Sequence, residues 1–151
     1  MFNQRIRQVM QSEKLLTAAP ETTVLRAAQL MAEGDSGAVL VVEGGALRGI
    51  FTERDAVLRV MAHDLNIQTT CLADVMTAAP LTIGPERKFG HALELMRQHR
   101  IRHLPVVENG APVGIVTGRS ALDPDLEEFV SEALRREGFA DDGSAATAGR
   151  P

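Results

Sequence analysis

The sequence predicts an α/β fold of the α+β type, in which two copies of one unit pack as a pseudo-two-fold pair. Three observations predict it: a duplication of the chain, an apolar helix pattern in each copy, and a β-hairpin pattern after each helix. Each unit is expected to hold a small mixed or antiparallel sheet and two helices. A single unit would expose apolar faces of its sheet and helices, so two units must pack together to bury a core.

The duplication appears when the chain is shifted by 65 residues, which places Leu16–Val57 on Leu81–Leu122 without a gap. The aligned copies share the segments Leu-Thr, Pro-Glu, Val-Val-Glu and Gly-Ile at matching positions. A repeat of this length is typical of a fold assembled from like units. We therefore expect a first repeat at residues 1–62 and a second at 63–122, with residues 63–72 as the connector between them.

Each copy predicts the same order of elements: a short strand, a helix, a hairpin and a second helix. The first helix follows from apolar residues at positions i, i+3, i+4 and i+7, namely Val24, Ala27, Ala28 and Met31, and Phe89, Ala92, Leu93 and Met96. β-rich runs then predict strands at Ala38–Val42, Arg48–Thr52, Leu104–Val107 and Val113–Thr117. Gly44-Gly45 and Asn109-Gly110 suit the positive φ angles of two-residue hairpin turns. The second helix is expected at Glu53–Met61, and a shorter one after Gly118.

The remainder of the chain predicts a C-terminal amphipathic helix at residues 123–138 and a disordered tail at 139–151. Acidic residues come first in this helix and arginines last, an order that complements the helix dipole. The tail is rich in Gly, Ala, Ser and Thr, a composition that cannot bury much apolar surface.

The composition excludes several function classes. A net charge of −4, with five Phe and no Trp or Tyr, argues against a nucleic-acid partner, which requires a basic face or stacking aromatics. No apolar run approaches the roughly 20 residues that span a bilayer, so no membrane partner is expected. Cys71 is the only cysteine, which excludes an internal disulfide. Together these features predict a cytoplasmic location.

The segment Thr52-Glu53-Arg54-Asp55 is the first candidate site, because it joins the end of a strand to the start of a helix. The hydroxyl of Thr52 and the guanidinium of Arg54 can contact phosphate, and the carboxylate of Asp55 can accept both hydroxyls of a ribose. The same spacing is that of a capping box, with Thr52 as N-cap and Asp55 reaching back. The spacing alone leaves both interpretations open.

The second copy carries Thr117, Arg119 and Ser120 at the matching positions. Serine cannot supply the two acceptor oxygens of a carboxylate. We therefore expect two unequal pockets, of which the one at Asp55 is the better ribose site.

The segment His99-Arg100-Ile101-Arg102-His103 is the densest cationic cluster of the chain. His99 and His103 have the i, i+4 spacing of a shared metal site on a helix, but the arginines between them would repel a cation, so no metal is expected. A solvated, charged helix end and a phosphate contact remain as the two interpretations.

Three motifs resemble one known family, the paired cystathionine-β-synthase (CBS) domains of the Bateman module. Asp74–Thr77 is similar to the family's opening motif, Arg100–Val107 to its central motif, and Gly49–Asp55 to its closing motif. The resemblance covers Ile6 to Leu122. The first copy departs from it, because Asp35–Leu40 replaces the central Arg-His-Leu-Pro run.

The resemblance implies a stand-alone, bacterial-type regulatory module that binds AMP, ATP, NAD or S-adenosylmethionine in clefts between the repeats. It implies contacts of Asp55 with ribose, of Thr52 with ribose or phosphate, and of Arg102 and His103 with phosphate. Thr17 and Thr82 precede the short strand that borders the base in the family, and an ordinary strand position is the alternative for both. No catalytic motif such as a P-loop or a GxSxG segment is present, so we expect no enzyme and no obligatory cofactor. A homodimer and an unidentified regulated protein are the expected partners. The alternative is a structural or protein-interaction module with vestigial pockets.

Overall fold

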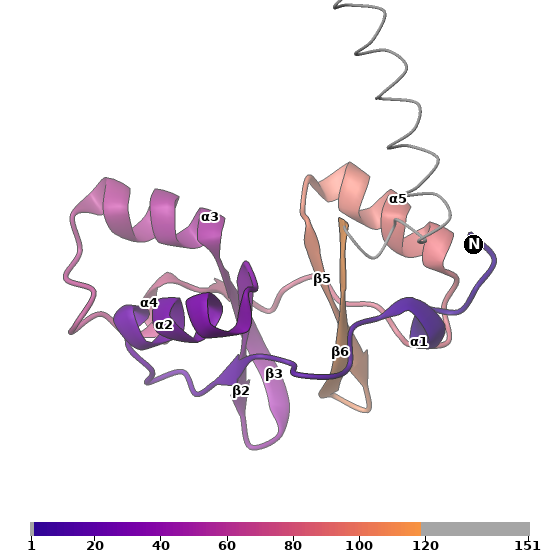
Figure 1. Cartoon of the computed structure of the whole chain (residues 1–151), viewed down its shortest axis with the longest axis horizontal. Coiled ribbons are helices and arrows are strands. Elements are labelled where there is room, and N and C mark those ends of the chain that lie inside the picture. The colour runs from indigo at the N-terminus through magenta and orange to yellow at the C-terminus, as the bar shows by residue number, and fades with distance from the viewer. Residues whose placement is uncertain (1, 119–151) are drawn as a thin grey trace, which may run out of the picture. The chain divides into compact units, whose positions relative to one another are not determined.

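The computed structural model describes residues 2–118, which form one compact unit. Its strands are β1 (Thr17–Ala18), β2 (Ala38–Glu43), β3 (Ala46–Thr52), β4 (Thr77–Ala78), β5 (His103–Glu108) and β6 (Ala111–Thr117). The first sheet has the strand order β1-β2-β3-β4, and the second contains β5 and β6 (Figure 1). The α-helices are α1 (Ile6–Val9), α2 (Val24–Gly34), α3 (Glu53–Asp55), α4 (Leu72–Val75) and α5 (Phe89–His99). The α+β fold class predicted from the sequence is confirmed.

The two hairpins confirm the duplication in detail. The β2–β3 hairpin runs from the pair Ala38↔Thr52 to Glu43↔Ala46, and the β5–β6 hairpin from His103↔Thr117 to Glu108↔Ala111. Each has one irregularity at the equivalent place, between Val41 and Val42 and between Val106 and Val107. Both turns have positive φ angles at their two central residues, as predicted for two-residue hairpins.

Each sheet is completed by the N-terminal segment of the other repeat. Strand β4, which opens the second repeat, pairs antiparallel with β3 of the first repeat. We call the part built on the β2–β3 hairpin the first half of the unit and the part built on the β5–β6 hairpin the second half. In the second half, Gln11 of the first repeat makes an antiparallel bridge to Ile115 of β6. The parallel β1–β2 pairing has its counterpart in the parallel bridge Ile83↔Val106. Each repeat therefore contributes an edge segment to the sheet of the other repeat, and neither sheet is built from one sequence repeat alone.

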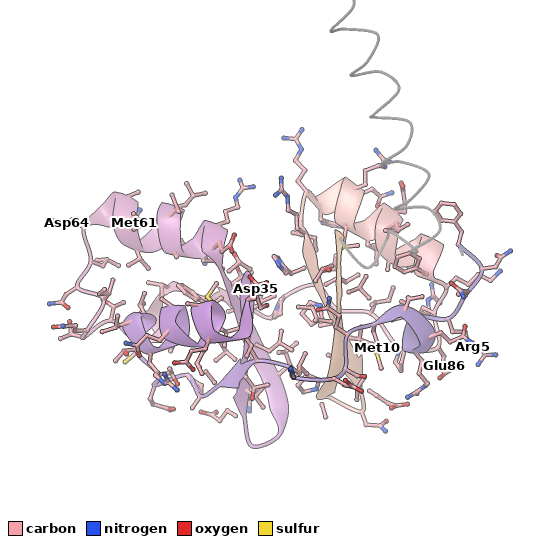
Figure 2. All side chains as sticks on the ribbon, viewed as in Figure 1. Arg5, Met10, Asp35, Met61, Asp64 and Glu86 are labelled. Carbon is pink, nitrogen blue, oxygen red and sulfur yellow. The ribbon has the colours of Figure 1, made fainter. Side chains whose placement is uncertain are left out.

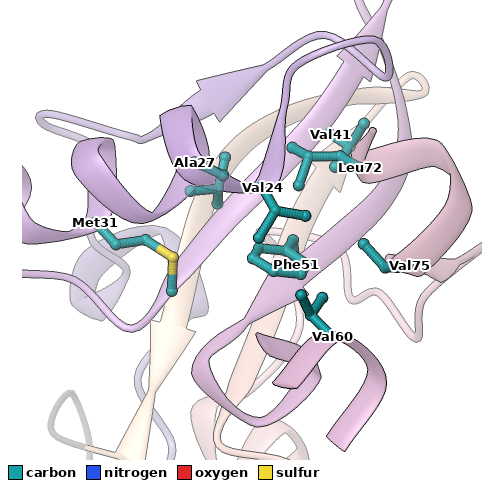
Figure 3. Packing of buried hydrophobic residues seen from close by; sticks show 9 residues of the cluster. Val24, Ala27, Met31, Val41, Phe51, Val60, Leu72 and Val75 are labelled. Atoms are coloured by element: carbon teal, nitrogen blue, oxygen red, sulfur yellow. The ribbon is translucent and has the colours of Figure 1, made fainter. Parts of the chain in front are cut away.

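The core of the first half shows the same exchange (Figure 3). Its buried residues come from α2, the β2–β3 hairpin, the segment after α3 and α4, and they are Val24, Ala27, Met31, Val39, Val41, Phe51, Val60, Leu72 and Val75. Helix α4 follows the connector in sequence, yet its apolar side chains pack in the core of the first half. In α2 the buried stripe is narrower than predicted, because Ala28 is exposed.

The N-terminal segment is likewise fixed to the second half. Ile6 is fully buried, and its amide donates to the carbonyl of Arg87 at 2.9 Å. At the surface, Arg5 and Arg7 both pair with Glu86, and the Arg7 pair measures 2.8 Å. Figure 2 shows Arg5 beside Glu86. These arginines hold the pKa of the Glu86 carboxyl below its usual range, chiefly through the hydrogen bond from Arg7.

The helix predicted at Glu53–Met61 is present but changes its hydrogen-bond register along its length. Helix α3 is followed by a π-helical segment, η1 (Ala56–Val60), and by a 3₁₀ turn, η2 (Met61–His63). This stretch exposes large apolar side chains, with Val57 at 51%, Leu58 at 50% and Met61 at 69%. The shorter helix after Gly118, the helix at 123–138 and the tail lie outside the described residues. Among residues 2–118, no helix is long and apolar enough to cross a membrane.

Candidate functional site

The capping box predicted as one interpretation of Thr52–Asp55 is present. Thr52 ends β3 and is the N-cap of α3, where its hydroxyl accepts a hydrogen bond from the Asp55 amide at 3.3 Å. The Asp55 carboxylate returns the contact, because its Oδ2 accepts from the Thr52 amide at 3.0 Å and from the Thr52 hydroxyl at 3.2 Å. Asp55 is only 7% exposed. The box therefore fixes a nearly buried carboxylate where the strand becomes a helix.

The other carboxylate oxygen of Asp55 has partners that the sequence did not reveal. Oδ1 accepts a hydrogen bond from the Thr77 hydroxyl at 3.3 Å and lies 3.4 Å from Nε of Arg59. Arg59 also donates through Nη1 to the carbonyl of Met76 at 2.7 Å. The i, i+4 spacing of Asp55 and Arg59 could have indicated that pair. Thr77 could not have been found this way, because only the exchanged strand β4 brings it to Asp55.

A second group of polar side chains, Glu53 and His103, lies where the open ends of the two hairpins meet. A Cβ added to Gly37 would lie 3.1 Å from Oε1 of Glu53 and 3.3 Å from Nε2 of His103. The Glu53 carboxylate of the first repeat and the His103 imidazole of the second are therefore neighbours, and both lie beside Gly37, which has no side chain. The backbone makes an equivalent hydrogen bond in each repeat. In the first repeat the amide of Glu53 donates to the carbonyl of Gly37 at 3.0 Å, and in the second the amide of Gly118 donates to the carbonyl of Arg102 at 3.2 Å.

The environment of His103 makes its protonation harder. Burial lowers the pKa of the imidazole below its ordinary value, and the positive charge of Arg102 lowers it further. The Glu53 carboxylate opposes both effects and raises it. The net direction is downward, so His103 is predominantly neutral near pH 7, when it can both donate and accept a hydrogen bond.

The remaining predicted site residues lie at the strand ends. Thr17 is in β1 and pairs with Leu40, whereas Thr82 immediately precedes the bridge residue Ile83; both threonines are exposed. Thr117 is the strand partner of His103. Arg54 and Arg102 are exposed, and Arg119 and Ser120 lie outside the described residues.

The structure thus brings together Thr52 with Asp55, and His103 with Arg102 and Thr117. Glu53, which the sequence analysis did not select, links the two groups because it adjoins the first and faces the second. His99 and His103 do not share a helix face, since α5 ends at His99 and Arg100 takes a φ of 53°. No group of three or more metal-ligating side chains occurs within residues 2–118.

Comparison with known proteins defines the class. The CBS domain family matches this chain twice, at residues 6–62 and 72–124, so the chain belongs to the CBS domain family as a pair of domains. It is 37% identical over 122 residues to a CBS domain-containing protein of Bacillus subtilis, covering 80% of this chain and 86% of that protein. It is 42% identical over 128 residues to the meiotically up-regulated gene 70 protein of Schizosaccharomyces pombe, covering 78% of this chain. The match spans only 18% of the length of that yeast protein.

Solved structures agree with this assignment. A protein with CBS domains from Burkholderia ambifaria is 30% identical and superposes with a TM-score of 0.73 over 78% of this chain and 90% of that one. A CBS domain protein from Pyrobaculum aerophilum, complexed with AMP, superposes with a TM-score of 0.73 over 85% of this chain and 99% of that one. At 22% identity the latter shows the fold alone.

Proposed function

We propose that this chain is a non-enzymatic regulatory module that binds an adenosyl ligand, such as AMP, ATP, NAD or S-adenosylmethionine, between its two repeats. The observation that carries the proposal is the nearly buried Asp55 carboxylate, which is fixed by the capping box and accepts donors from both repeats. A carboxylate in a fixed orientation is the group that recognises the paired hydroxyls of a ribose. Similar folds in complex with AMP, or with methylthioadenosine and S-adenosylmethionine, support this choice of ligand class.

Phosphate recognition is assigned to the residues around His103. Arg102 is exposed, and Arg54 follows directly on Glu53, which faces His103. A guanidinium fork suits a phosphate, and the neutral imidazole of His103 can donate one hydrogen bond to it. The Glu53 carboxylate beside His103 would repel a phosphate group that carries a high negative charge. The combination therefore favours a monophosphate or an uncharged 5′ group over a polyphosphate.

The ligand proposal is tested by binding to the purified protein. Because the chain has no Trp or Tyr, co-purified nucleotide would dominate its absorbance near 260 nm. Thermal-shift titrations with AMP, ATP, NAD and S-adenosylmethionine follow. A ligand at 100 times its Kd adds about 2.7 kcal/mol to the free energy of unfolding. Asp55→Ala should abolish the shift, whereas Asp74→Ala, which removes an exposed carboxylate of α4, should leave it intact. Four titrations without a shift would overturn the proposal.

The second candidate is a structural or interaction module with vestigial pockets. One observation favours it: every polar contact of Asp55 is already satisfied within the chain, as a purely structural cap would require. Under this alternative, Asp55→Ala lowers stability but no adenosyl ligand raises it. The same titrations therefore separate the two candidates.

We further propose that a second copy covers the apolar surface of Val57, Leu58 and Met61, giving a homodimer. Three large side chains, each at least half exposed, stand close together on η1 and η2, and Figure 2 shows Met61 on that outer helical stretch. Leu58→Glu should shift the protein to monomers in analytical ultracentrifugation, because a buried carboxylate without a partner opposes association. Leu81→Glu, which alters an exposed leucine elsewhere, is the matched control. A Leu58→Glu variant that sediments as the wild type does would assign the interface to another surface.

A further inference from the structure

The Asp55 carboxylate has no free acceptor position in the described structure. Four donor groups surround it: the amide and hydroxyl of Thr52 on Oδ2, and the Thr77 hydroxyl and the Arg59 guanidinium on Oδ1. An ionised carboxylate offers about four lone-pair positions. A ribose that donates its two hydroxyls to Asp55 must therefore displace two of the donors already present.

The donors on Oδ1 are the ones that can leave. Both contacts on Oδ2 come from Thr52, three residues away, and the one from the Thr52 amide belongs to the capping box that starts α3. On Oδ1, the guanidinium of Arg59 stands at 3.4 Å, and its side chain is 49% exposed, so water can replace the contact. The Asp55 side chain of this pair is only 10% exposed, but a charge-assisted contact at 3.4 Å is longer than the about 2.7–2.9 Å of a strong one, so it holds Arg59 loosely. Oδ1 is thus the oxygen that can exchange Thr77 and Arg59 for a ligand.

Arg59 lies in a segment with an ambiguous helical register. The amide of Met61 donates both to Ala56, five residues back, and to Val57, four residues back. The amide of Leu65 again donates five residues back, to Val60 at 3.1 Å. A π-helical register is rare and occurs mostly as short insertions at functional sites. At its C-terminal end the segment Ala56–Val60 therefore combines the α-helical and the π-helical hydrogen-bond patterns.

Arg59 connects this segment to the exchanged strand. It contacts Asp55 through Nε and the carbonyl of Met76 through Nη1 at 2.7 Å. Met76 directly precedes β4, and Thr77, the other donor on Oδ1, is the first residue of β4. Loss of both Oδ1 contacts would release η1 and β4 from Asp55 at the same time.

We propose that capture of a ligand diol by Asp55 displaces Thr77 and Arg59 and thereby loosens the π-helical segment Ala56–Val60. The inference rests on the proposed ligand site and adds its means of regulation. Arg59 and Thr77 act as positioning residues that hold the free protein in one state, and the ligand selects the other. Since Val57 and Leu58 belong to the same segment, ligand occupancy changes the apolar surface offered to a partner.

Hydrogen exchange tests the coupling directly. In wild-type protein, AMP should speed amide exchange in residues 56–65 severalfold, the reverse of the protection that a ligand normally confers on its site. In the absence of AMP, Arg59→Gln should speed exchange in the same segment. Arg48→Gln is the matched control, because Arg48 is an equally exposed arginine paired with Glu43 at 3.7 Å. Exchange in 56–65 that is unchanged by AMP and by Arg59→Gln overturns the coupling.

Affinity gives an independent test of the competition. If Arg59 must leave before the ligand binds, its removal raises the fraction of competent protein, and Arg59→Gln should lower the Kd for AMP about two- to fivefold. Thr77→Val should act in the same direction, and Arg48→Gln should have no effect. If AMP binds and Asp55→Ala abolishes binding, but Arg59→Gln and Thr77→Val leave the affinity unchanged or weaker, only the displacement is overturned. If wild-type protein does not bind AMP at all, the AMP site and the displacement are overturned together.

Discussion

The two oxygens of the Asp55 carboxylate have different partners, one within its own segment and one in the other repeat. Oδ2 closes a capping box within its own segment, whereas Oδ1 accepts from Thr77 of the other repeat. Of the two interpretations that the spacing left open, the capping box is present, and the ligand contact is our proposal. The cap orients the carboxylate through Oδ2, and Oδ1 is the oxygen that our proposal assigns to a ligand.

His103 is the residue whose titration should be visible in stability. Its pKa in the folded protein is lowered by burial and by Arg102, and Glu53 only partly offsets this. Between the two pKa values the unfolded chain binds more protons than the folded one. The free energy of unfolding should therefore fall as the pH drops from about 7.5 through the ordinary histidine pKa of about 6.5 and toward the lower folded value.

Urea unfolding of wild-type protein and of His103→Gln over this pH range measures the effect. The variant should lose less stability on acidification, because glutamine does not titrate. His91→Gln, which replaces an exposed histidine on α5, should keep the wild-type slope. Parallel curves for wild type and His103→Gln would contradict the assigned environment.

At the scale of elements, the hairpins and the exchanged edge segments carry the pseudo-symmetry. Gly49 and Gly114 occupy equivalent positions where an edge segment crosses its host strand. A Cβ at Gly49 would meet the carbonyl of Thr77 at 2.9 Å, and one at Gly114 would meet Met10 Sδ at 2.6 Å. Real Cβ atoms do not approach other atoms this closely, so each repeat needs glycine at this place for close approach rather than for a turn.

Gly49→Ala should therefore destabilise the protein by about 1–3 kcal/mol, the usual cost of overpacking. The added Cβ would clash with the Met76 side chain and with the carbonyl of Thr77, and the carbonyl belongs to the exchanged strand and cannot rotate away as a side chain can. Denaturant unfolding checks this, with Gly84→Ala as the control, because a Cβ there would meet only Arg87 Cγ at 3.9 Å. Equal stability of the two variants would mean that β4 can move away from β3 at little cost.

At the scale of the whole described unit, each half contains a helix that belongs to the sequence of the other repeat. The second half includes α1, whose Ile6 is fully buried and whose Arg7 pairs with Glu86 and Glu108, both at 2.8 Å. The first half includes α4, which packs beside β3 and η1 in Figure 3. Unfolding of one half therefore also exposes the buried apolar side chains of a helix from the other repeat.

Ile6→Ala should lower the free energy of unfolding by about 2–5 kcal/mol, as expected for truncation of a buried side chain. Because α1 packs in the second half, hydrogen exchange should increase in α5 and β6 more than in the β2–β3 hairpin. Val57→Ala, at a half-exposed position, should have a small effect on both. An increase spread equally over both halves would show that the unit opens only as a whole.

Local patterns in the sequence determined the duplication, the α2 and α5 helices, both hairpins with their turns, and the capping box at Thr52. These features depend on contacts between residues close in the chain or on the period of apolar residues, so a single sequence contains them. The resemblance to paired CBS domains followed from motifs in constant order, and the family assignment confirms it.

Only the tertiary structure revealed the exchange of edge segments, the contact of Thr77 with Asp55, and the approach of Glu53 to His103 over Gly37. It also revealed the π-helical register at Ala56–Val60, where the sequence pattern predicts an ordinary helix. The physical reason is common to all of them. Each arises between segments distant in sequence or from competition between two hydrogen-bond patterns, and neither leaves a periodic trace in the chain.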